Sequence, residues 1–454
     1  VSRPATTTPP KPLDCQNVRI IQITPGTGDY HCGCSIRDGA LLLELRRQGH
    51  DVTCLPLYLP LVTEEGSLTD APIFYSGISV YLEQKIPFMR RMPAWLDRCL
   101  SHPRLLKHIA SRADMTSAAE HGDMTLSMLR GESGHQAREL EKLIAWIRSN
   151  EKPDIIVLSM SLLVGLARQL RDTLNVPVVC SLQGEDAFLD SLPEDIRREA
   201  WALVSERLAD VDAMIAPTHY YAQHMQQRTG VPADRIHTIY NGLDTTGYEE
   251  RDQLPSPHRV GFLAHVCPAK GIDTFIDAFI HLRTVLGDTS TRLMIAGAMT
   301  RVDHKQMDVH RARLEKAGLW QDVECHPNVS KTEKQALLRS CSLLSVPADY
   351  DEAFGLYMAE ALLSGVPVVQ PDRGAFPEIV AASGGGLLHR PGDVEHLAQQ
   401  WQAVLQDTEL NKRLSHAGRT FAQREFAVTT MAERILATYT EICRRRPGSA
   451  MREG

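Results

Sequence analysis

Short apolar runs alternate with helical patterns along the first half of the chain. Residues 18–23 form a run with β-branched side chains, and Ser35 can cap the amphipathic stretch that follows and ends at Gly49. The same rhythm returns in later apolar runs at residues 52–55, 154–158, 176–182, 214–216 and 236–239. Strands that alternate with helices in this way predict a parallel sheet covered by helices on both faces.

A second array of the same kind follows a charged, proline-containing stretch after Asn241-Gly242. Its predicted strands are residues 259–263, 292–296, 322–325, 343–346 and 366–370, and a last amphipathic helix is predicted at 429–443. The fold class is therefore α/β, with two doubly wound, Rossmann-like domains that face a central cleft. Open α/β sheets bind ligands at the carboxyl ends of their strands, so we expect the site in that cleft.

The length of 454 residues suits two cores of ordinary size. We expect the chain to divide into a disordered leader (1–13), an N-terminal Rossmann-like domain (14–250, with an insertion at 81–135), a linker (251–258), a C-terminal Rossmann-like domain (259–425) and a C-terminal helix and tail (426–454). Residues 81–110 mix apolar and basic side chains. Two interpretations stay open: a packed helical insertion with a solvated basic face, or a peripheral contact with anionic lipid.

Composition excludes several classes of function. The net charge of −7 argues against nucleic-acid binding, and no run of 18 apolar residues predicts a membrane-spanning helix. The first residues lack the apolar core of a signal peptide. The ten cysteines include no Cys-x-x-Cys pair. Scattered cysteines are typical of reduced thiols in the cytoplasm, and we expect no bound metal.

The most informative stretch is Pro-Ala-Asp-Tyr-Asp-Glu-Ala-Phe-Gly-Leu-Tyr-Met-Ala-Glu, which ends at Glu360. A helix is predicted to begin at Gly355, which leaves the backbone N–H groups of 355–357 facing the cleft. Such a helix N-terminus is suited to a diphosphate. Glu352 precedes the helix and Glu360 lies within it, and a carboxylate accepts hydrogen bonds from sugar or ribose hydroxyls.

These two glutamates match the Glu-x7-Glu motif of the retaining family 4 glycosyltransferases (glycosyl transferases group 1) with the GT-B fold. The chain resembles that family in the flanking sequence as well, through Phe354-Gly355-Leu356, Gly-Val-Pro-Val-Val at 365–369 and Pro-Glu-Ile at 377–379. The resemblance implies that Glu352 contacts the donor sugar, that Glu360 contacts the ribose, and that the last helix crosses back to the N-terminal domain. It also implies that the residues between the glutamates line the donor site: Phe354, Gly355, Leu356 and Tyr357.

A second stretch, residues 260–271, is similar to the family's strand and loop that bind the donor phosphates. Lys270 matches the expected lysine, whereas His265 stands where the family usually has an arginine. A histidine is only partly charged near neutral pH and cannot form a two-pronged contact with phosphate. Two further resemblances follow: the loop with Gly26 and Gly28 is similar to one that closes over the donor, and Gly297 to a contact with the donor base.

Candidate acceptor contacts follow the predicted strand at 176–182. Gln183, Glu185 and Asp186 come directly after it, so their side chains are expected near the cleft. Capping of a helix that begins at Ala187 is an equally good interpretation of the two acids.

The resemblance implies retaining transfer of a hexose from a nucleotide-sugar, by family frequency a UDP-sugar, without metal or other cofactor. The acceptor, a glycan, a lipid or a small molecule, is left open, as is a peripheral position at the inner face of the membrane. Two alternatives remain: a catalytically impaired sugar-nucleotide-binding protein, and a GT-B nucleotide-sugar epimerase.

Overall fold

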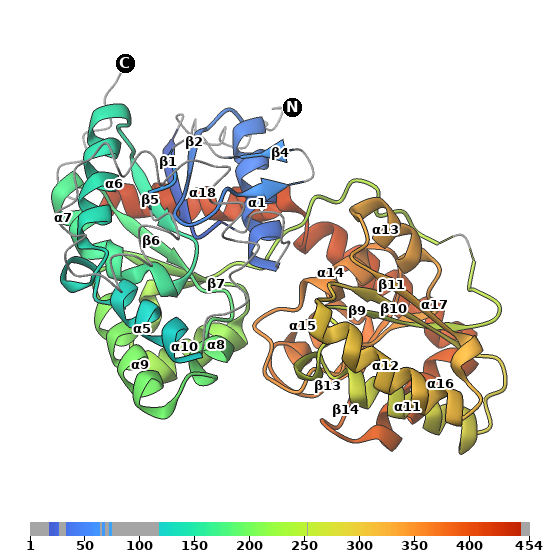
Figure 1. The fold of residues 1–454 in the computed structure, drawn as a ribbon. Coiled ribbons are helices and arrows are strands. Elements are labelled where there is room, and N and C mark those ends of the chain that lie inside the picture. Colours follow the sequence, from blue (N-terminus) through green and yellow to red (C-terminus); the bar gives the residue numbers. More distant parts are fainter. Residues whose placement is uncertain are drawn as a thin grey trace, which may run out of the picture.

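The computed structural model describes residues 18–26, 33–63, 66–68, 72–74, 118–251 and 253–445. These residues form two α/β domains (Figure 1). The expectations for the leader (1–13), for Gly28 and for the basic segment 81–110 lie outside the described residues, and the insertion 81–135 is described only from residue 118 onward.

The first domain is built on a six-stranded sheet with the order β2-β1-β5-β6-β7-β8, and its strand pairs are parallel. The strands are β1 (Arg19–Thr24), β2 (Asp51–Pro56), β5 (Ile155–Leu158), β6 (Val178–Ser181), β7 (Ala213–Ala216) and β8 (Ile236–Thr238). The helices are α1 (Gly33–Arg47), α5 (Ala118–Leu129), α6 (Ala137–Asn150), α7 (Ala167–Leu174), α8 (Asp186–Asp190), α9 (Glu194–Leu208) and α10 (His219–Thr229). The chain order reverses between β1 and β5, where this class of sheet opens a crevice.

Two local features of this domain differ from the sequence prediction. Helix α1 begins at Gly33, so Ser35 is a buried residue inside the helix and not its cap. A short antiparallel pair, β3 (Val62–Thr63) with β4 (Gly66–Ser67), was not predicted. Strands of two residues carry too little periodicity to be recognised in a sequence.

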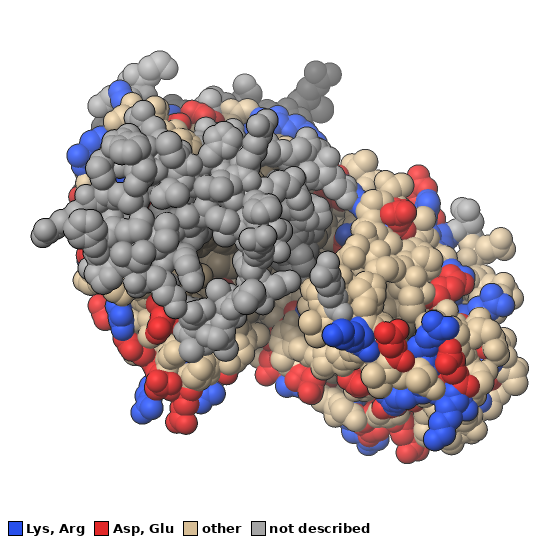
Figure 2. All heavy atoms as spheres, viewed as in Figure 1, with Lys and Arg blue, Asp and Glu red and all other residues tan. Residues whose placement is uncertain are grey.

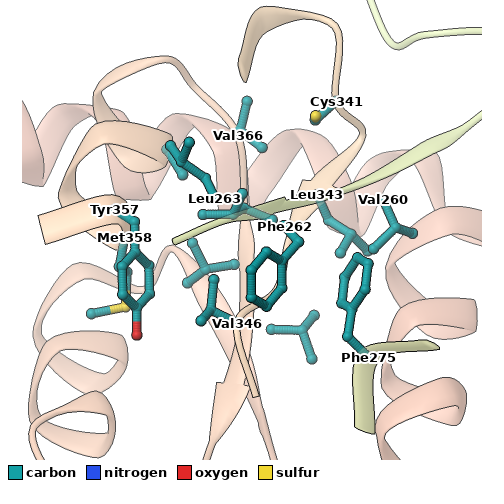
Figure 3. Packing of buried hydrophobic residues seen from close by; sticks show 14 of the residues in the cluster. Val260, Phe262, Leu263, Phe275, Cys341, Leu343, Val346, Tyr357, Met358 and Val366 are labelled. Carbon is teal, nitrogen blue, oxygen red and sulfur yellow. The ribbon is translucent and has the colours of Figure 1, made fainter. Parts of the chain in front are cut away.

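The second domain repeats the architecture with the order β11-β10-β9-β12-β13-β14. Its strands are β9 (Arg259–Leu263), β10 (Arg292–Gly297), β11 (Val323–Pro327), β12 (Leu343–Leu344), β13 (Val368–Pro371) and β14 (Gly386–His389). Its helices are α11 (Ile272–Thr284), α12 (Arg301–Lys316), α13 (Lys331–Arg339), α14 (Leu356–Leu363), α15 (Phe376–Ser383), α16 (Val394–Gln406) and α17 (Thr408–Glu425). Phe262 and Val260 of the central strand pack with Phe275 of α11 in the core of this domain (Figure 3).

The last helix, α18 (Val428–Arg445), packs against the first domain, where it lies beside the sheet (Figure 1). Its apolar positions Met431, Ile435 and Tyr439 share one buried cluster with Leu41 of α1 and Val52 of β2. The chain passes from the first domain to the second after β8 and returns before α18. A backbone bridge between Leu243 and Ala427 joins these two segments. The domains are thus joined by a pair of adjacent chain segments.

Candidate active site

The motif around Glu352 connects the end of β12 to the start of α14. Gly355 is the N-cap of α14 and has a φ of 79°, in the left-handed region that favours glycine. Within the described residues, the backbone N–H groups of 355–357 form no hydrogen bond. The helix therefore presents an uncapped N-terminus, as the sequence predicted, and its use for a diphosphate stays a prediction.

Glu352 is buried and forms the centre of a compact polar cluster. Its Oε1 accepts hydrogen bonds from Lys270 Nζ, from the hydroxyl of Tyr350 at 2.9 Å and from the hydroxyl of Tyr357 at 3.1 Å. Lys270 Nζ also lies 4.8 Å from the ring centroid of Tyr350 and 5.5 Å from that of Tyr357. Burial raises the pKa of both tyrosines, so they remain protonated donors. Lys270 and Glu352, predicted from separate motifs, thus meet in one site.

The loop that carries Glu352 is held by the segment leading into α15. The backbone N–H of Ala375 donates to the carbonyl of Glu352 at 2.9 Å, and Arg373 Nε donates to Asp351 Oδ1 at 2.8 Å. Gly374 has a φ of 60°, and a Cβ at this position would lie 2.7 Å from the backbone nitrogen of Glu352. The close approach of these two loops therefore requires glycine at 374.

Glu360, the second glutamate of the motif, is also buried but has other partners. Its Oε1 accepts a hydrogen bond from the hydroxyl of Tyr248 at 2.7 Å and forms an ion pair with Lys334 Nζ of α13. The ribose contact that the resemblance implies stays a prediction. A ribose hydroxyl at Oε1 has to share that oxygen with Lys334 and Tyr248.

His265 contacts an acid at the start of α12. Its Nε2 lies 2.8 Å from Asp303 Oδ2, and Asp303 completes a capping box with Thr300. Burial raises the pKa of Asp303, but the hydrogen bonds from Thr300 and His265 outweigh it and leave the pKa below its usual value. The histidine side chain is thus held by the acid that caps α12.

Two predicted glycines stand where backbone segments touch. A Cβ on Gly297, which has a φ of 141°, would lie 1.8 Å from the carbonyl oxygen of Ala264. A Cβ on Gly26, with a φ of 74°, would lie 1.5 Å from that of Leu59. Both positions require glycine for packing, and their predicted contacts with the donor remain predictions.

The three candidate acceptor residues have different hydrogen-bond partners in the structure. Gln183 Nε2 donates to the carbonyl of Ser159 at 2.6 Å, within the first domain. Glu185 is buried and accepts from the backbone N–H groups of Ser161 at 2.7 Å and Gln183 at 2.8 Å. Gln183 and Glu185 therefore stabilise their own domain. Their contact with an acceptor stays a prediction. The capping interpretation is wrong, since α8 begins at Asp186 and the Glu185 side chain makes no cap bond.

Asp186 follows the same loop, in which a Cβ on Gly184 would lie 3.3 Å from Cβ of Ala353, next to Glu352. Its carboxylate accepts from the hydroxyl of Tyr221 at 2.8 Å and lies 3.2 Å from Nε2 of His224. The hydrogen bond to Asp186 raises the pKa of His224. Burial, the charge of Glu352 and, to a smaller extent, the charge of Asp186 raise the pKa of Tyr350 in the second domain.

Sequence reasoning missed several residues of the site. Tyr350 lies two positions before Glu352, and its place inside the motif was an available signal. Asp303, Lys334 and Tyr248 come from other elements, and nothing in their local sequence marks them. They are found only when the fold places them beside His265 and Glu360.

Comparison with known families identifies both halves of the chain. Residues 249–421 match the family described as glycosyl transferases group 1, and residues 124–246 match glycosyltransferase family 4. The chain belongs to the family 4 glycosyltransferases. These two matched regions contain the Glu352 loop and the candidate acceptor side, respectively.

Individual relatives of this glycosyltransferase family are distant. The D-inositol 3-phosphate glycosyltransferase of Xylanimonas cellulosilytica is 28% identical over 278 residues, which cover 56% of this chain and 63% of that protein. The phosphatidyl-myo-inositol mannosyltransferase of Mycobacterium leprae is 28% identical over 209 residues, or 45% and 53% of the two chains. The alignments thus span between half and two thirds of these curated relatives.

Solved structures match over nearly the whole chain. Anabaena Alr3699/HepE in complex with UDP superposes with a TM-score of 0.66 at 17% identity, over 93% of this chain and 100% of that one. Sucrose-phosphate synthase from Thermosynechococcus elongatus gives a TM-score of 0.67 at 16% identity, over 94% and 100%. The predicted GT-B fold is confirmed.

Proposed function

We propose that the protein is a retaining, metal-independent glycosyltransferase that transfers a hexose from a nucleotide-sugar to a hydroxyl acceptor. The observation that carries this proposal is the contact of Lys270 with Glu352 beside the uncapped N-terminus of α14. A cation and a helix N-terminus together offset the charge of a leaving diphosphate, while a carboxylate stabilises positive charge on the sugar.

In the proposed mechanism, Lys270 and Glu352 exchange their contact with each other for contacts with the donor. When the donor binds, the Lys270 side chain turns from Glu352 to the diphosphate. The diphosphate also accepts hydrogen bonds from the backbone N–H groups of 355–357. Glu352 keeps its hydrogen bonds from Tyr350 and Tyr357 and accepts hydroxyls of the sugar. The sugar–phosphate bond breaks as the acceptor oxygen approaches from the same face, and the departing phosphate takes the acceptor proton. No separate general base is then needed.

Relatives and neighbours support the class of donor and acceptor. UDP and UDP-glucose are the ligands of the Anabaena structures, which supports a UDP-sugar here. The names of the relatives support an acceptor that is a polyol phosphate or an inositol lipid. Asp186, whose charge acts on Tyr350, is the acceptor contact we favour among the three candidates.

We also propose a cytoplasmic location, which the scattered cysteines support. Among the described residues, no helix is long and apolar enough to cross a bilayer. On the face drawn in Figure 2, basic and acidic side chains are interspersed over the described surface. That distribution supports a small-molecule enzyme over a nucleic-acid-binding protein.

The decisive test is hydrolysis of a panel of nucleotide-sugars by the purified protein in the presence of EDTA. We expect slow release of one nucleoside diphosphate by the wild type and a loss of at least about 100-fold in Glu352→Gln, because the amide cannot stabilise positive charge. Glu395→Gln, at an exposed glutamate in the first turn of α16, is the matched control. NMR of the first-formed sugar should show the anomer of the donor.

Three outcomes would contradict the proposal. Release that EDTA abolishes would overturn metal independence, and an inverted sugar would overturn retention. Tight binding of UDP without release from any donor, even with added polyol acceptors, would favour the sugar-nucleotide-binding protein. This second candidate is supported by His265, which stands where the family usually has an arginine and contacts Asp303.

A further inference from the structure

Glu378 lies in the second domain, but its side chain is bound by the first. It occupies the first turn of α15. Its Oε1 accepts from the backbone N–H of His219 at 3.1 Å and from the hydroxyl of Tyr240 at 3.1 Å, and its Oε2 accepts from the N–H of Tyr220 at 2.7 Å. Within the described residues, all hydrogen-bond partners of this carboxylate belong to the N-terminal side of the molecule.

The carboxylate therefore caps a helix of the other domain. His219 and Tyr220 are the first two residues of α10, whose N–H groups at this end have no partner inside the helix. A negative charge at a helix N-terminus is stabilised by the helix dipole and by charge-assisted hydrogen bonds. The contact is thus specific in both geometry and charge.

The same end of α10 also touches the loop that carries Glu352. Thr218, the N-cap residue, accepts from the N–H of Tyr221 at 3.1 Å and donates its own hydroxyl to the carbonyl of Ala353 at 2.9 Å. Ala353 directly follows Glu352. Thr218 is fully buried, so solvent does not compete for this hydrogen bond.

On the second domain, α15 is joined to Glu352 by its own backbone. Ala375 N–H donates to the carbonyl of Glu352 at 2.9 Å, and Ile379 N–H donates to the carbonyl of Ala375 at 3.1 Å. Glu378 is therefore one helical turn from the residue that holds the Glu352 backbone. Helix α10, Glu378, α15 and Glu352 form a continuous set of contacts across the domain interface, on the side of the second domain that faces the first (Figure 1).

We propose that Glu378 is a positioning residue for the transfer reaction. Together with Thr218 it holds the first domain against the Glu352 loop. It thereby sets the distance between the donor sugar on the second domain and the attacking group, which is the acceptor in transfer or water in hydrolysis. This inference rests on the proposed function. A shift of about 1 Å between reacting groups is enough to cost about 100-fold in rate, so loosening this contact should slow transfer more than it weakens donor binding.

The test compares Glu378→Gln and Thr218→Val with the wild type. The glutamine keeps the shape of the side chain but loses its charge. Its amide NH2 replaces one acceptor oxygen, so a donor would face a backbone N–H donor of α10. We expect kcat for nucleotide-sugar hydrolysis to fall about 10- to 100-fold in both variants, while the Kd of UDP, measured by calorimetry, changes less than about threefold. Glu395→Gln is the matched control, because in the part of the chain that the structure describes the Glu395 side chain accepts a hydrogen bond from Gln399 alone, within its own helix.

Small-angle scattering makes the inference testable apart from catalysis. We expect the radius of gyration of Glu378→Gln with saturating UDP to exceed that of the wild type, and the thermal midpoint to stay within a few degrees. Unchanged kcat and unchanged scattering in both variants would overturn the inference. The inference would also be overturned if UDP affinity fell by the same factor as kcat and the thermal midpoint dropped by more than a few degrees, because that result indicates a structural role alone. If the wild type hydrolyses no donor, the proposed function fails, and scattering still decides the role of Glu378.

Discussion

At the scale of single residues, Lys270 and Glu352 form a buried ion pair. Each is buried enough that losing its partner without a substitute is costly. Under the proposed function, a nucleotide-sugar supplies both substitutes at once, a phosphate for the lysine and hydroxyls for the glutamate. Both residues were predicted from the sequence because each lies in a short motif, whereas the bridging role of Tyr350 depends on the conformation of the loop.

His265 offers a test at the same scale. Replacing it with arginine should tighten UDP binding about tenfold, or roughly 1.4 kcal/mol, because a guanidinium can bond Asp303 and the diphosphate together. Calorimetry at constant salt measures the effect. His304→Arg, an exposed position one residue after Asp303, controls for added positive charge alone. Equal affinity in His265→Arg and the wild type would show that position 265 lies away from the phosphates.

At the scale of elements, the sequence located most strands and the last helix to within a few residues, since each has its own periodicity. The start of α14 was predicted because glycine marks a helix terminus. The start of α1 was not, and α8 begins one residue earlier than expected. Ser35 and Glu185 suggested caps, but Ser35 is buried inside α1, and the Glu185 carboxylate accepts from the backbone N–H of Ser161 instead.

Gly355→Ala tests the N-terminus of α14 as an anion site. The left-handed backbone should cost about 1–2 kcal/mol of folding stability in the variant. A Cβ at this position would also lie 3.1 Å from Phe376 Cε1, so we expect the helix start to shift and UDP affinity to fall about tenfold or more. Denaturant titration and calorimetry measure the two effects.

The matched control is Gly392→Ala. Gly392 has a similar φ of 72°, and a Cβ added there would meet no atom within 4 Å. This variant should lose similar stability and keep wild-type UDP affinity. If the two variants bind UDP equally well, the start of α14 does not hold the diphosphate.

At the scale of the whole molecule, the C-terminal helix completes the core of the N-terminal domain. Ile435 of α18 is buried in the cluster that also contains Leu41 of α1 and Val52 of β2. Removing α18 would expose one face of the first sheet to solvent. The stability of the first domain therefore depends on residues at the opposite end of the chain.

Ile435→Ala should destabilise the first domain by about 2–5 kcal/mol, the usual range for truncating a buried isoleucine. Hydrogen exchange followed by mass spectrometry should show faster exchange in peptides from β1 and β2, with little change in β9 and β10. Val302→Ala, at a valine that is 74% exposed, is the control and should change stability by less than about 0.5 kcal/mol. Faster exchange confined to the second domain would contradict this assignment.

The sequence by itself determined the two α/β halves, the Glu352–Glu360 motif and Lys270, because these features are written in periodicity and short spacing. Tertiary structure alone decided that Gln183 and Glu185 serve the first domain and that Glu378 caps α10. The physical reason is distance along the chain. Glu378 and Tyr220 are 158 residues apart, and only the packing of one sheet beside the other brings a carboxylate of one domain to a helix terminus of the other.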